Sequence, residues 1–448
     1  MSRPTSLSGF PEWLPRQRIV EQHVVDHLRR TFELHGFAGI ETRAVEPLEQ
    51  LLRKGETSKE VYVLRRLQEE TDGTAAGGIA DRGDQLGLHF DLTVPFARYV
   101  LENAGHLAFP FRRYQIQKAW RGERPQEGRF REFLQADIDV VDRDTLPFHY
   151  DVEIPLIIGD ALRGLPIPPV RVQVNNRKLC EGFYRGLGVG DPEAALRAVD
   201  KLDKIGPAAV AALLVETAGA TEAQAKACLA LAEISSEDAS FADAVRALGV
   251  RDDLLDEGLD ELVQVVETGR ENQPGLMVAD LRIARGLDYY TGTVYETQMR
   301  GYERMGSICS GGRYDNLASS GTDRYPGVGI SVGVSRMLGV LFGASALSVS
   351  RSVPTCVLVA VTSEAERPSS NRTAAALRRR GIPTEVSPSA AKFGKQIRYA
   401  ERRGIPYVWF PSSEGSEVKD IRSGDQVVAD PSTWTPPAED LRPTVTAS

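Results

Sequence analysis

One stretch, residues 111–139, constrains the fold of this chain more than any other, and it reads FRRYQIQKAWRGERPQEGRFREFLQADID. Apolar and polar residues roughly alternate over 114–120 and again over 133–141, which predicts two antiparallel strands. Pro125 and Gly128 lie between them and predict a turn. The connecting loop carries four arginines: Arg121, Arg124, Arg129 and Arg131. A rigid pair of strands would present these four guanidiniums around one mouth.

Clustered arginines of this kind suit a phosphate ligand. A planar guanidinium forms bidentate hydrogen bonds to phosphoryl oxygens, and several together stabilise the charge that develops in phosphoryl or nucleotidyl transfer. The aromatic residues Trp120, Phe130 and Phe133 lie among the arginines, and such rings can stack on a purine. A solvated, charge-rich hairpin is the alternative. The interleaved aromatics favour a site that stacks on a purine and holds its phosphates.

Composition places the chain among soluble globular proteins. Its 448 residues predict about three domains, and its 42% hydrophobic and 26% charged residues indicate no fibrous or disordered class. A net charge of −8 argues against a surface coated with nucleic-acid-binding charge. The four cysteines are far apart and form no CxxC pair, so we expect neither a zinc site nor a disulfide framework, and a cytoplasmic location fits. No signal peptide or transmembrane helix is expected.

Charge is distributed unevenly along the chain. Residues 191–272 hold 18 acidic and 7 basic side chains in Ala- and Leu-rich sequence, which predicts an inserted helical domain. Residues 351–410 hold 11 basic and 4 acidic side chains in a pattern of alternating strands and helices, which predicts an α/β domain that binds a phosphate backbone. The last residues, 431–448, are rich in Pro, Ser and Thr and are predicted to be a disordered tail.

The N-terminal part predicts a helix and then a ligand-binding strand. Apolar residues recur at four-residue spacing over 16–35, and Gly36 predicts the end of that helix. The segment 86–100, LGLHFDLTVPFARYV, begins with alternation that predicts a strand. Asp91 and Thr93 would then share one face of it, where a carboxylate and a hydroxyl can reach a ligand ammonium together.

Two later segments complete the candidate site. The sequence RGLDYYTG, 285–292, offers the cation Arg285 and the phenols Tyr289 and Tyr290, and a phenol can both donate and accept a hydrogen bond. CSGGRYDNL, from residue 309, predicts a Gly-Gly turn. Three glycines at 327, 329 and 333 predict a strand that admits a nucleotide close to the backbone, with Arg336 opening a helix. The chain has neither GxGxxG at that place nor GxxxxGK[ST].

Together these segments resemble the class II aminoacyl-tRNA synthetases, and in detail the histidyl-tRNA synthetases. RGERPQ, GRFREF and LQADID stand in the order of motif 2. The helix 16–35 followed by a short strand in 36–52 resembles motif 1, 327–342 resembles motif 3, and RGLDYYTG is similar to the signature specific to histidyl-tRNA synthetases. The likeness runs from about residue 12 to about residue 430. Three positions depart from the family pattern: Arg43 replaces a proline, His89 an arginine and Ser335 an acidic residue.

The resemblance implies an α+β fold. Its catalytic domain, 1–340, would be an antiparallel sheet flanked by helices and interrupted by the insertion 191–272, whose acidity leaves open whether it reaches the tRNA acceptor arm or is a solvated lid. An anticodon-binding α/β domain would span 351–430. The resemblance also implies a homodimer.

The implied activity is ATP-dependent attachment of L-histidine to tRNA(His) through histidyl-adenylate, with Mg²⁺ on the pyrophosphate oxygens. Arg121 and Arg285 would be the catalytic residues. The implied histidine-binding residues are Asp91, Thr93, Gln135, Asp139, Tyr289 and Tyr290. The implied ATP-binding residues are Arg121, Glu123, Arg129, Phe133 and Arg336.

Two alternatives from other classes stay open at this stage. A regulatory subunit of ATP phosphoribosyltransferase resembles the same catalytic domain, but it typically lacks the C-terminal domain and the catalytic motif residues, and both are present here. An RNA sensor could keep the fold without the chemistry, against which Arg121, Arg285 and Arg336 count. Histidine-dependent exchange between ATP and pyrophosphate discriminates among the three.

Overall fold

The computed structural model describes residues 5–52, 60–65, 85–283, 286, 289–412 and 415–448. The chain divides into two compact units: Met1–Pro11 with Val25–Val340, and Glu12–Val24 with Leu341–Ser448. Arg285 and all of residues 66–84 lie outside the described residues. Within the described part, no helix has the length and apolar character needed to cross a membrane.

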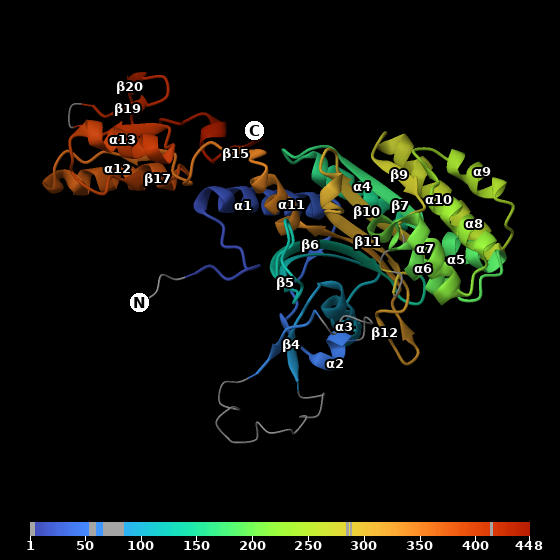
Figure 1. Cartoon of the computed structure of the whole chain (residues 1–448). Coiled ribbons are helices and arrows are strands. Elements are labelled where there is room, and N and C mark those ends of the chain that lie inside the picture. Colours follow the sequence, from blue (N-terminus) through green and yellow to red (C-terminus); the bar gives the residue numbers. More distant parts are fainter. Residues whose placement is uncertain (1–4, 53–59, 66–84, 284–285, 287–288, 413–414) are drawn as a thin grey trace. The chain divides into compact units, whose positions relative to one another are not determined.

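A nine-stranded sheet forms the centre of the first unit (Figure 1). Its strands, in spatial order, are β1 (Ala38–Gly39), β5 (Phe111–Trp120), β6 (Glu132–Val141), β14 (Gly327–Gly333), β11 (Cys309–Tyr314), β10 (Thr293–Met299), β7 (Val170–Asn176), β9 (Met277–Asp280) and β8 (Ser235–Ser236). Neighbours from β5 to β7 all pair antiparallel. Only β1 with β5 and β7 with β9 pair parallel among these described strands. The predicted antiparallel sheet, including the strand pair of the arginine loop, is confirmed.

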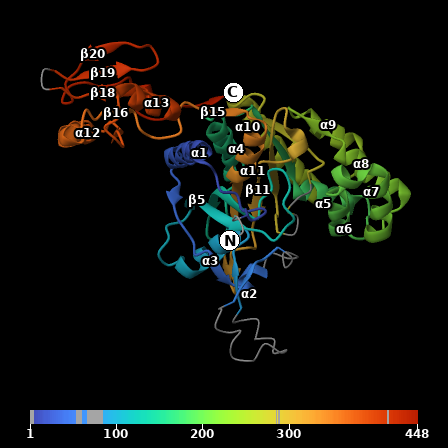
Figure 2. The same ribbon diagram turned by 60° about the vertical axis from the view of Figure 1, so that its left-hand side comes forward.

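Helices cover one face of this sheet. The helix α4 (His149–Arg163) packs on β6, β7 and β14, and α10 (Asp253–Asn272) packs on α4, β7 and β9. Figure 2 shows α4 and α10 next to each other. Along β6, Ala136, Ile138 and Val140 are fully buried. Because strand residues alternate between faces, Gln135, Asp137 and Asp139 point to the opposite face. The polar face of β6 is therefore available for a site.

The acidic segment 191–272 is helical, as predicted. Besides α10 it holds α6 (Pro192–Val199), α7 (Leu202–Ala218), α8 (Glu222–Ala232) and α9 (Ser240–Ala247). Side-chain caps begin several of these helices: Asp191 accepts a hydrogen bond from the backbone N–H of Ala194, and Thr221 forms a reciprocal capping box with Gln224. The limits of an insertion domain stay a prediction.

The prediction of a strand through Asp91 and Thr93 is wrong. The strand β4 (Leu86–Leu88) ends after three residues, and α3 (Thr93–Asn103) begins at Thr93. Asp91 Oδ1 accepts a hydrogen bond from the backbone N–H of Val94 at 3.1 Å, and a proline such as Pro95 is tolerated in the first turn of a helix. Helix initiation therefore overrides the alternating pattern.

The predicted Gly-Gly turn is also wrong, because Gly311 and Gly312 lie inside β11. A Cβ atom on Gly311 would lie 2.1 Å from the carbonyl oxygen of Gly329, and one on Gly312 would lie 2.9 Å from the ring of Tyr290. A Cβ atom on Gly329 would lie 2.2 Å from Oδ1 of Asp139. These glycines make room for neighbouring protein atoms, not for a turn.

The second unit is an α/β layer, as the alternating pattern predicted. Its five-stranded sheet has the order β17 (Thr384–Val386), β16 (Val357–Val359), β18 (Tyr407–Phe410), β19 (Glu417–Asp420) and β20 (Gln426–Val428). The strand β16 pairs parallel with β17 and β18. α12 (Arg367–Arg379) and α13 (Phe393–Arg403) cover opposite faces: Leu377 packs with Val357, and Ala400 packs with Leu358.

The prediction that residues 431–448 are a disordered tail is also wrong, because these residues are folded as part of the second unit. The strand β21 (Val445–Ala447) pairs antiparallel with β15 (Leu347–Val349). The ring of Trp434 packs edge-on against Trp409, with 5.6 Å between ring centroids. Pro-, Ser- and Thr-rich composition suggested disorder, but one large apolar anchor inside the tail outweighs it.

Candidate active site

Two adjoining cavities lie at the polar face of the sheet in the first unit. The larger has a volume of about 340 Å³ and the smaller of about 60 Å³. Seven residues line both: Arg121, Gln135, Tyr289, Tyr290, Ser310, Gly311 and Ser331. A ligand in one cavity would therefore be in contact range of a ligand in the other.

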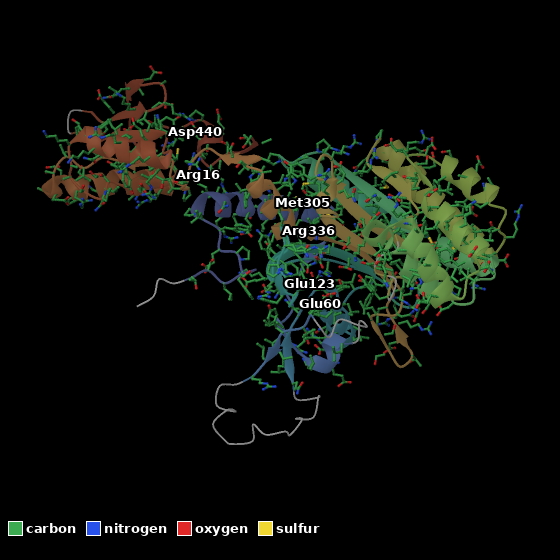
Figure 3. The ribbon with its side chains drawn as sticks, in the orientation of Figure 1. Arg16, Glu60, Glu123, Met305, Arg336 and Asp440 are labelled. Atoms are coloured by element: carbon green, nitrogen blue, oxygen red, sulfur yellow. The ribbon has the colours of Figure 1, made fainter. Side chains whose placement is uncertain are left out.

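All five predicted ATP-binding residues line the larger cavity. Arg121 lies with its guanidinium carbon 5.2 Å from the ring centroid of Phe133, and its Nε donates to the carbonyl oxygen of Phe90 at 3.0 Å. Arg129 lies 3.6 Å from the carboxylate of Glu123. Arg336 donates to the carbonyl oxygen of Met305 (Figure 3). Cations around an aromatic ring are the groups that a purine nucleotide with its phosphates requires.

The prediction of four arginines at one mouth holds for only two of them. Arg121 and Arg129 line the larger cavity, whereas Arg124 is exposed and lines neither cavity, and Arg131 donates from Nε to the carbonyl oxygen of Glu123 at 3.2 Å. The predicted turn is present at Gly128, whose φ is +68°. Arg131 therefore braces the loop itself.

The predicted histidine-binding residues gather at the smaller cavity. Asp91, Thr93 and Asp139 line it, although the first two reach it from a helix start. Asp139 is held from behind: Arg113 Nη2 lies 2.6 Å from Oδ2, and the hydroxyl of Tyr314 donates to Oδ1 at 2.7 Å. The buried guanidinium and phenol leave Asp139 little freedom to turn.

Tyr289 and Tyr290 form the wall between the two cavities. Their ring centroids are 4.1 Å apart. Burial raises the pKa of Tyr289 above its usual value, so its phenol stays protonated and can donate a hydrogen bond at neutral pH. Arg285 lies outside the described residues, so its predicted catalytic role stays a prediction.

The three departures from the family pattern are scaffold contacts. His89 is fully buried, its Nε2 lies 2.7 Å from the carbonyl oxygen of Lys118, and burial lowers its pKa. The hydroxyl of Ser335 accepts a hydrogen bond from the backbone N–H of Leu134 at 2.8 Å. Arg43 Nη2 lies 2.9 Å from Oε2 of Glu46, which is buried.

Sequence reasoning missed Asp137. This carboxylic acid lines the smaller cavity, is 2% exposed, and lies on β6 between Gln135 and Asp139. The signal was present, because residues two apart on a strand face the same side. The predicted alternation of 133–141 should have placed Asp137 in the site together with its two neighbours.

Comparison with known proteins shows the family of the chain. The family model "Histidyl-tRNA synthetase" matches residues 9–337, and the family model "Anticodon binding domain" matches residues 355–410. The chain belongs to the histidyl-tRNA synthetase family. A histidine–tRNA ligase from Micrococcus luteus is 60% identical over 455 residues, covering 99% of each chain.

Solved structures agree with the family. The crystal structure of histidyl-tRNA synthetase from Nostoc sp. PCC 7120 has a TM-score of 0.83 at 33% identity, and the match covers 96% of this chain and 97% of that one. An ATP phosphoribosyltransferase regulatory subunit/histidyl-tRNA synthetase from Bacillus halodurans has a TM-score of 0.70 at 19% identity, covering 86% and 93%. At that identity the second match shows the shared fold alone.

Family membership settles the activity predicted from the sequence. Relatives 52% to 60% identical over nearly the full length are histidine–tRNA ligases. The chain is an enzyme of this class, a class II aminoacyl-tRNA synthetase that uses ATP as a substrate. The regulatory-subunit alternative is not favoured, because the chain matches the family model of the anticodon-binding domain in addition to that of the catalytic part.

Proposed function

We propose that the smaller cavity binds histidine, that the larger binds ATP, and that the first step of the family reaction takes place where they join. The observation that supports this most is the position of Arg121 on the wall common to both. The carboxylate of histidine attacks the α-phosphorus of ATP, the bond to pyrophosphate breaks, and histidyl-adenylate forms. Arg121 contacts the attacking carboxylate and the α-phosphate together. Positioning and charge neutralisation then supply most of the catalysis.

Around ATP, we assign three further roles. Phe133 stacks on the adenine, and Arg129 and Arg336 hold the phosphates, which matches their positions on the larger cavity. Glu123 orients Arg129 through the ion pair at 3.6 Å. Arg285 is proposed as the second catalytic cation on the strength of the RGLDYYTG likeness alone.

Around histidine, the α-ammonium group and the ring need different partners. We assign the ammonium to Asp91, Thr93 and Gln135, which line the smaller cavity and present oxygen acceptors. Asp139 and Tyr290, with Tyr289 beside them, hydrogen-bond the imidazole. A pocket that pairs both ring nitrogens rejects other amino acids because they would leave these buried polar groups unpaired.

Magnesium is proposed as the companion of ATP. Among the described residues, no group of three or more His, Cys, Asp or Glu side chains could hold a metal ion. Mg²⁺ is commonly held by substrate phosphates and one or two carboxylates, and Glu123 and Glu296 both line the larger cavity. Bound there, the ion would neutralise phosphate charge.

We propose that tRNA(His) binds through the second unit, which contains the anticodon-binding match at 355–410. Exposed cations on its two helices can contact the phosphate backbone. The terminal ribose hydroxyl of the tRNA then takes the histidyl group from the adenylate. This second step needs no covalent enzyme intermediate.

We also propose a homodimer. The likeness to motif 1 supports it, as do the exposed edge strand β1 and Leu34, which is 86% exposed. A second copy pairing at this edge would cover both. Sedimentation equilibrium tests the proposal, and a monomer at micromolar concentration would contradict it.

A cytoplasmic location is proposed from the cysteines. All four are buried free thiols, which a reducing compartment maintains. Cell fractionation with an antibody to the chain tests it, and recovery outside the soluble cytoplasmic fraction would contradict it.

Arg121 offers the test of the catalytic assignment. Arg121→Ala should reduce histidine-dependent exchange between ATP and pyrophosphate by about a hundredfold, the effect of losing one transition-state contact worth about 3 kcal/mol. Arg121→Lys should recover little, because an ammonium cannot make the bidentate contact. Arg285→Ala should behave like Arg121→Ala in the same assay.

Arg124→Ala is the matched control, since it removes an arginine of the same loop that lines neither cavity. Its exchange rate should stay within about twofold of the unmodified enzyme, as for a surface substitution. Equal losses in the Arg121 and Arg124 variants would contradict the assignment, because they would point to loop stability and not to a contact with the reacting groups.

A further inference from the structure

Three polar side chains lie in a row across β6 and β14. Ser331 on β14 is the cross-strand partner of Asp137 on β6, and Gln135 lies two residues before Asp137 on the same face. Gln135 Nε2 donates to Ser331 Oγ at 2.5 Å. The hydroxyl of Ser331 also lowers the pKa of Asp137, which is the effect of a donor facing a carboxylate. Ser331 is therefore placed to join the amide of one residue to the carboxyl of the other.

When Ser331 bonds both neighbours and Asp137 is ionised, the protons in this row can be arranged in only one way. A carboxylate only accepts hydrogen bonds, and a serine hydroxyl has a single proton to give. Ser331 must give that proton to Asp137, so its oxygen accepts from the NH₂ group of Gln135. This leaves Oε1 of Gln135, which is buried and has no hydrogen-bond partner among the described residues, as the acceptor that faces the cavity.

When Asp137 is protonated, the hydrogen bonds in this row can be donated in the opposite direction. The carboxylic O–H donates to Ser331, and Ser331 in turn donates to Gln135. The amide of Gln135 must then turn over and offer its NH₂ group to the cavity. Two N–H donors cannot pair with an ammonium group, so this form of the site is mismatched to an amino acid's amine.

The surroundings of Asp137 make both protonation states accessible near neutral pH. Burial raises its pKa to about 7 against the opposing effect of Arg113 on β5, with Asp139 on its own strand and Asp91 before α3 raising it further. Cys309 on β11 also faces it. The other ionisable side chains lining the same cavity are Arg121, Tyr289, Tyr290 and Tyr314.

We propose that Asp137 is a positioning residue for amino-acid recognition: through Ser331 it determines which end of the Gln135 amide faces the substrate's ammonium group. Histidine binds the form in which Asp137 is ionised and Gln135 presents its carbonyl oxygen. Histidine uptake near pH 7 is then linked to loss of one proton from Asp137. The inference rests on the proposed function, in which Gln135 contacts the substrate amine.

The test is the pH dependence of the KM for histidine in pyrophosphate exchange, measured from pH 6 to pH 8 for the unmodified enzyme and Asp137→Asn. The imidazole of histidine titrates near pH 6.5 in both experiments, so the ratio of the two KM values removes its contribution. That ratio should rise about tenfold between pH 8 and pH 6, as the ionised fraction of a group with a pKa near 7 falls. The KM for ATP should show no such difference.

Identical pH profiles in the two enzymes would overturn the proposal. The variant Ser331→Ala separates an effect passed from Asp137 through Ser331 to Gln135, here called the relay, from a direct effect of the Asp137 charge. It keeps Asp137 but removes the connecting hydroxyl. The proposal requires the pH dependence to shrink to that of Asp137→Asn. If Ser331→Ala keeps the full dependence, Asp137 acts directly on the substrate and the proposed route is wrong.

Gln135→Ala distinguishes failure of this inference from failure of the underlying assignment. An unchanged KM for histidine in Gln135→Ala would remove Gln135 from the amine site and with it the premise. A raised KM in Gln135→Ala, combined with an unaltered pH profile in Asp137→Asn, would leave the premise standing and overturn the relay alone. An unchanged KM for ATP shows for each variant that the site is folded.

Discussion

At the scale of single residues, the support behind Asp139 is unusually costly to disturb. Arg113 is fully buried, lies 2.6 Å from the Asp139 carboxylate, and has its guanidinium carbon 4.3 Å from the ring centroid of Phe96. Breaking a buried ion pair by removing one partner leaves an uncompensated charge, which costs more than the pair itself contributes. The Arg113–Asp139 ion pair thus serves both the stability of the fold and the geometry of the site.

Arg113→Met should lower the free energy of unfolding by about 3 kcal/mol and raise the KM for histidine more than the KM for ATP. The control is Arg112→Met on the opposite face of β5, where the side chains of the ion pair with Glu153 are 21% and 35% exposed. That control should cost about 1 kcal/mol or less and leave both KM values unchanged. Denaturant unfolding and exchange kinetics measure the two effects, and equal changes in the two variants would contradict the special role of Arg113.

Asp137 should also affect stability, with a sign that depends on pH. Its pKa in the folded protein is about 7, above the ordinary value of 3.8, so the folded state holds a proton that the unfolded state has lost between these values. Stability therefore falls as pH rises from about 4 to about 7, and the low level persists above 7. Asp137→Asn removes the buried charge and should raise the unfolding midpoint at pH 8 but much less at pH 5. A pH-independent difference would contradict the raised pKa.

At the scale of elements, the folded tail shows how one segment completes a unit. Asp440 accepts hydrogen bonds at 2.7 Å from the hydroxyl of Tyr407 and from both terminal nitrogens of Arg422. Arg351 donates to the carbonyl oxygen of Asp440 at 2.9 Å. These bonds join the tail to β18, to the turn after β19 and to the segment before β16.

Deleting residues 431–448 should therefore destabilise the second unit, because it exposes the rings that Trp434 covers and leaves Arg422 with only Asp420 of its two carboxylate partners. A loss of about 3 kcal/mol is expected for removing one large aromatic contact and a charge-assisted network. Hydrogen exchange of the β16 and β18 amides measures it. Protection equal to that of the full chain would mean that the tail is dispensable for folding.

At the scale of the whole molecule, charge is divided between segments. The helical segment 191–272 is strongly acidic. Residues 351–410, which include the anticodon-binding match, hold 11 basic and 4 acidic side chains. Arg398 and Arg402 are exposed on α13, four residues apart and thus on one face of that helix. They are candidates for phosphate contacts.

Arg398→Glu combined with Arg402→Glu should reduce tRNA charging at least about tenfold and flatten its dependence on salt, because two phosphate contacts are lost. Pyrophosphate exchange, which needs only histidine and ATP, should stay within about twofold of the unmodified enzyme. The matched control is Arg372→Glu with Arg379→Glu on α12, which covers the opposite face of the sheet. Equal losses in both double variants would show a general effect of charge and no preferred face.

The sequence alone determined the elements whose signals are local. Alternation predicted β5 and β6, apolar spacing predicted α1 (Pro15–Leu34), and the quoted motifs identified the family. These predictions succeeded because the periods of strands and helices depend on consecutive residues and not on distant parts of the chain. The candidate residues of the two cavities came from the same motifs.

Only the tertiary structure decided which side chains meet. Ser331 meets Asp137 because β14 pairs with β6, and Gly311, expected in a turn, lies in a strand at a place where Gly329 approaches too closely for any side chain. The tail folds because Trp434 finds Trp409, a partner with no mark in the local sequence. Burial, close approach and pKa depend on neighbours distant in the chain, and a local pattern carries no information about them.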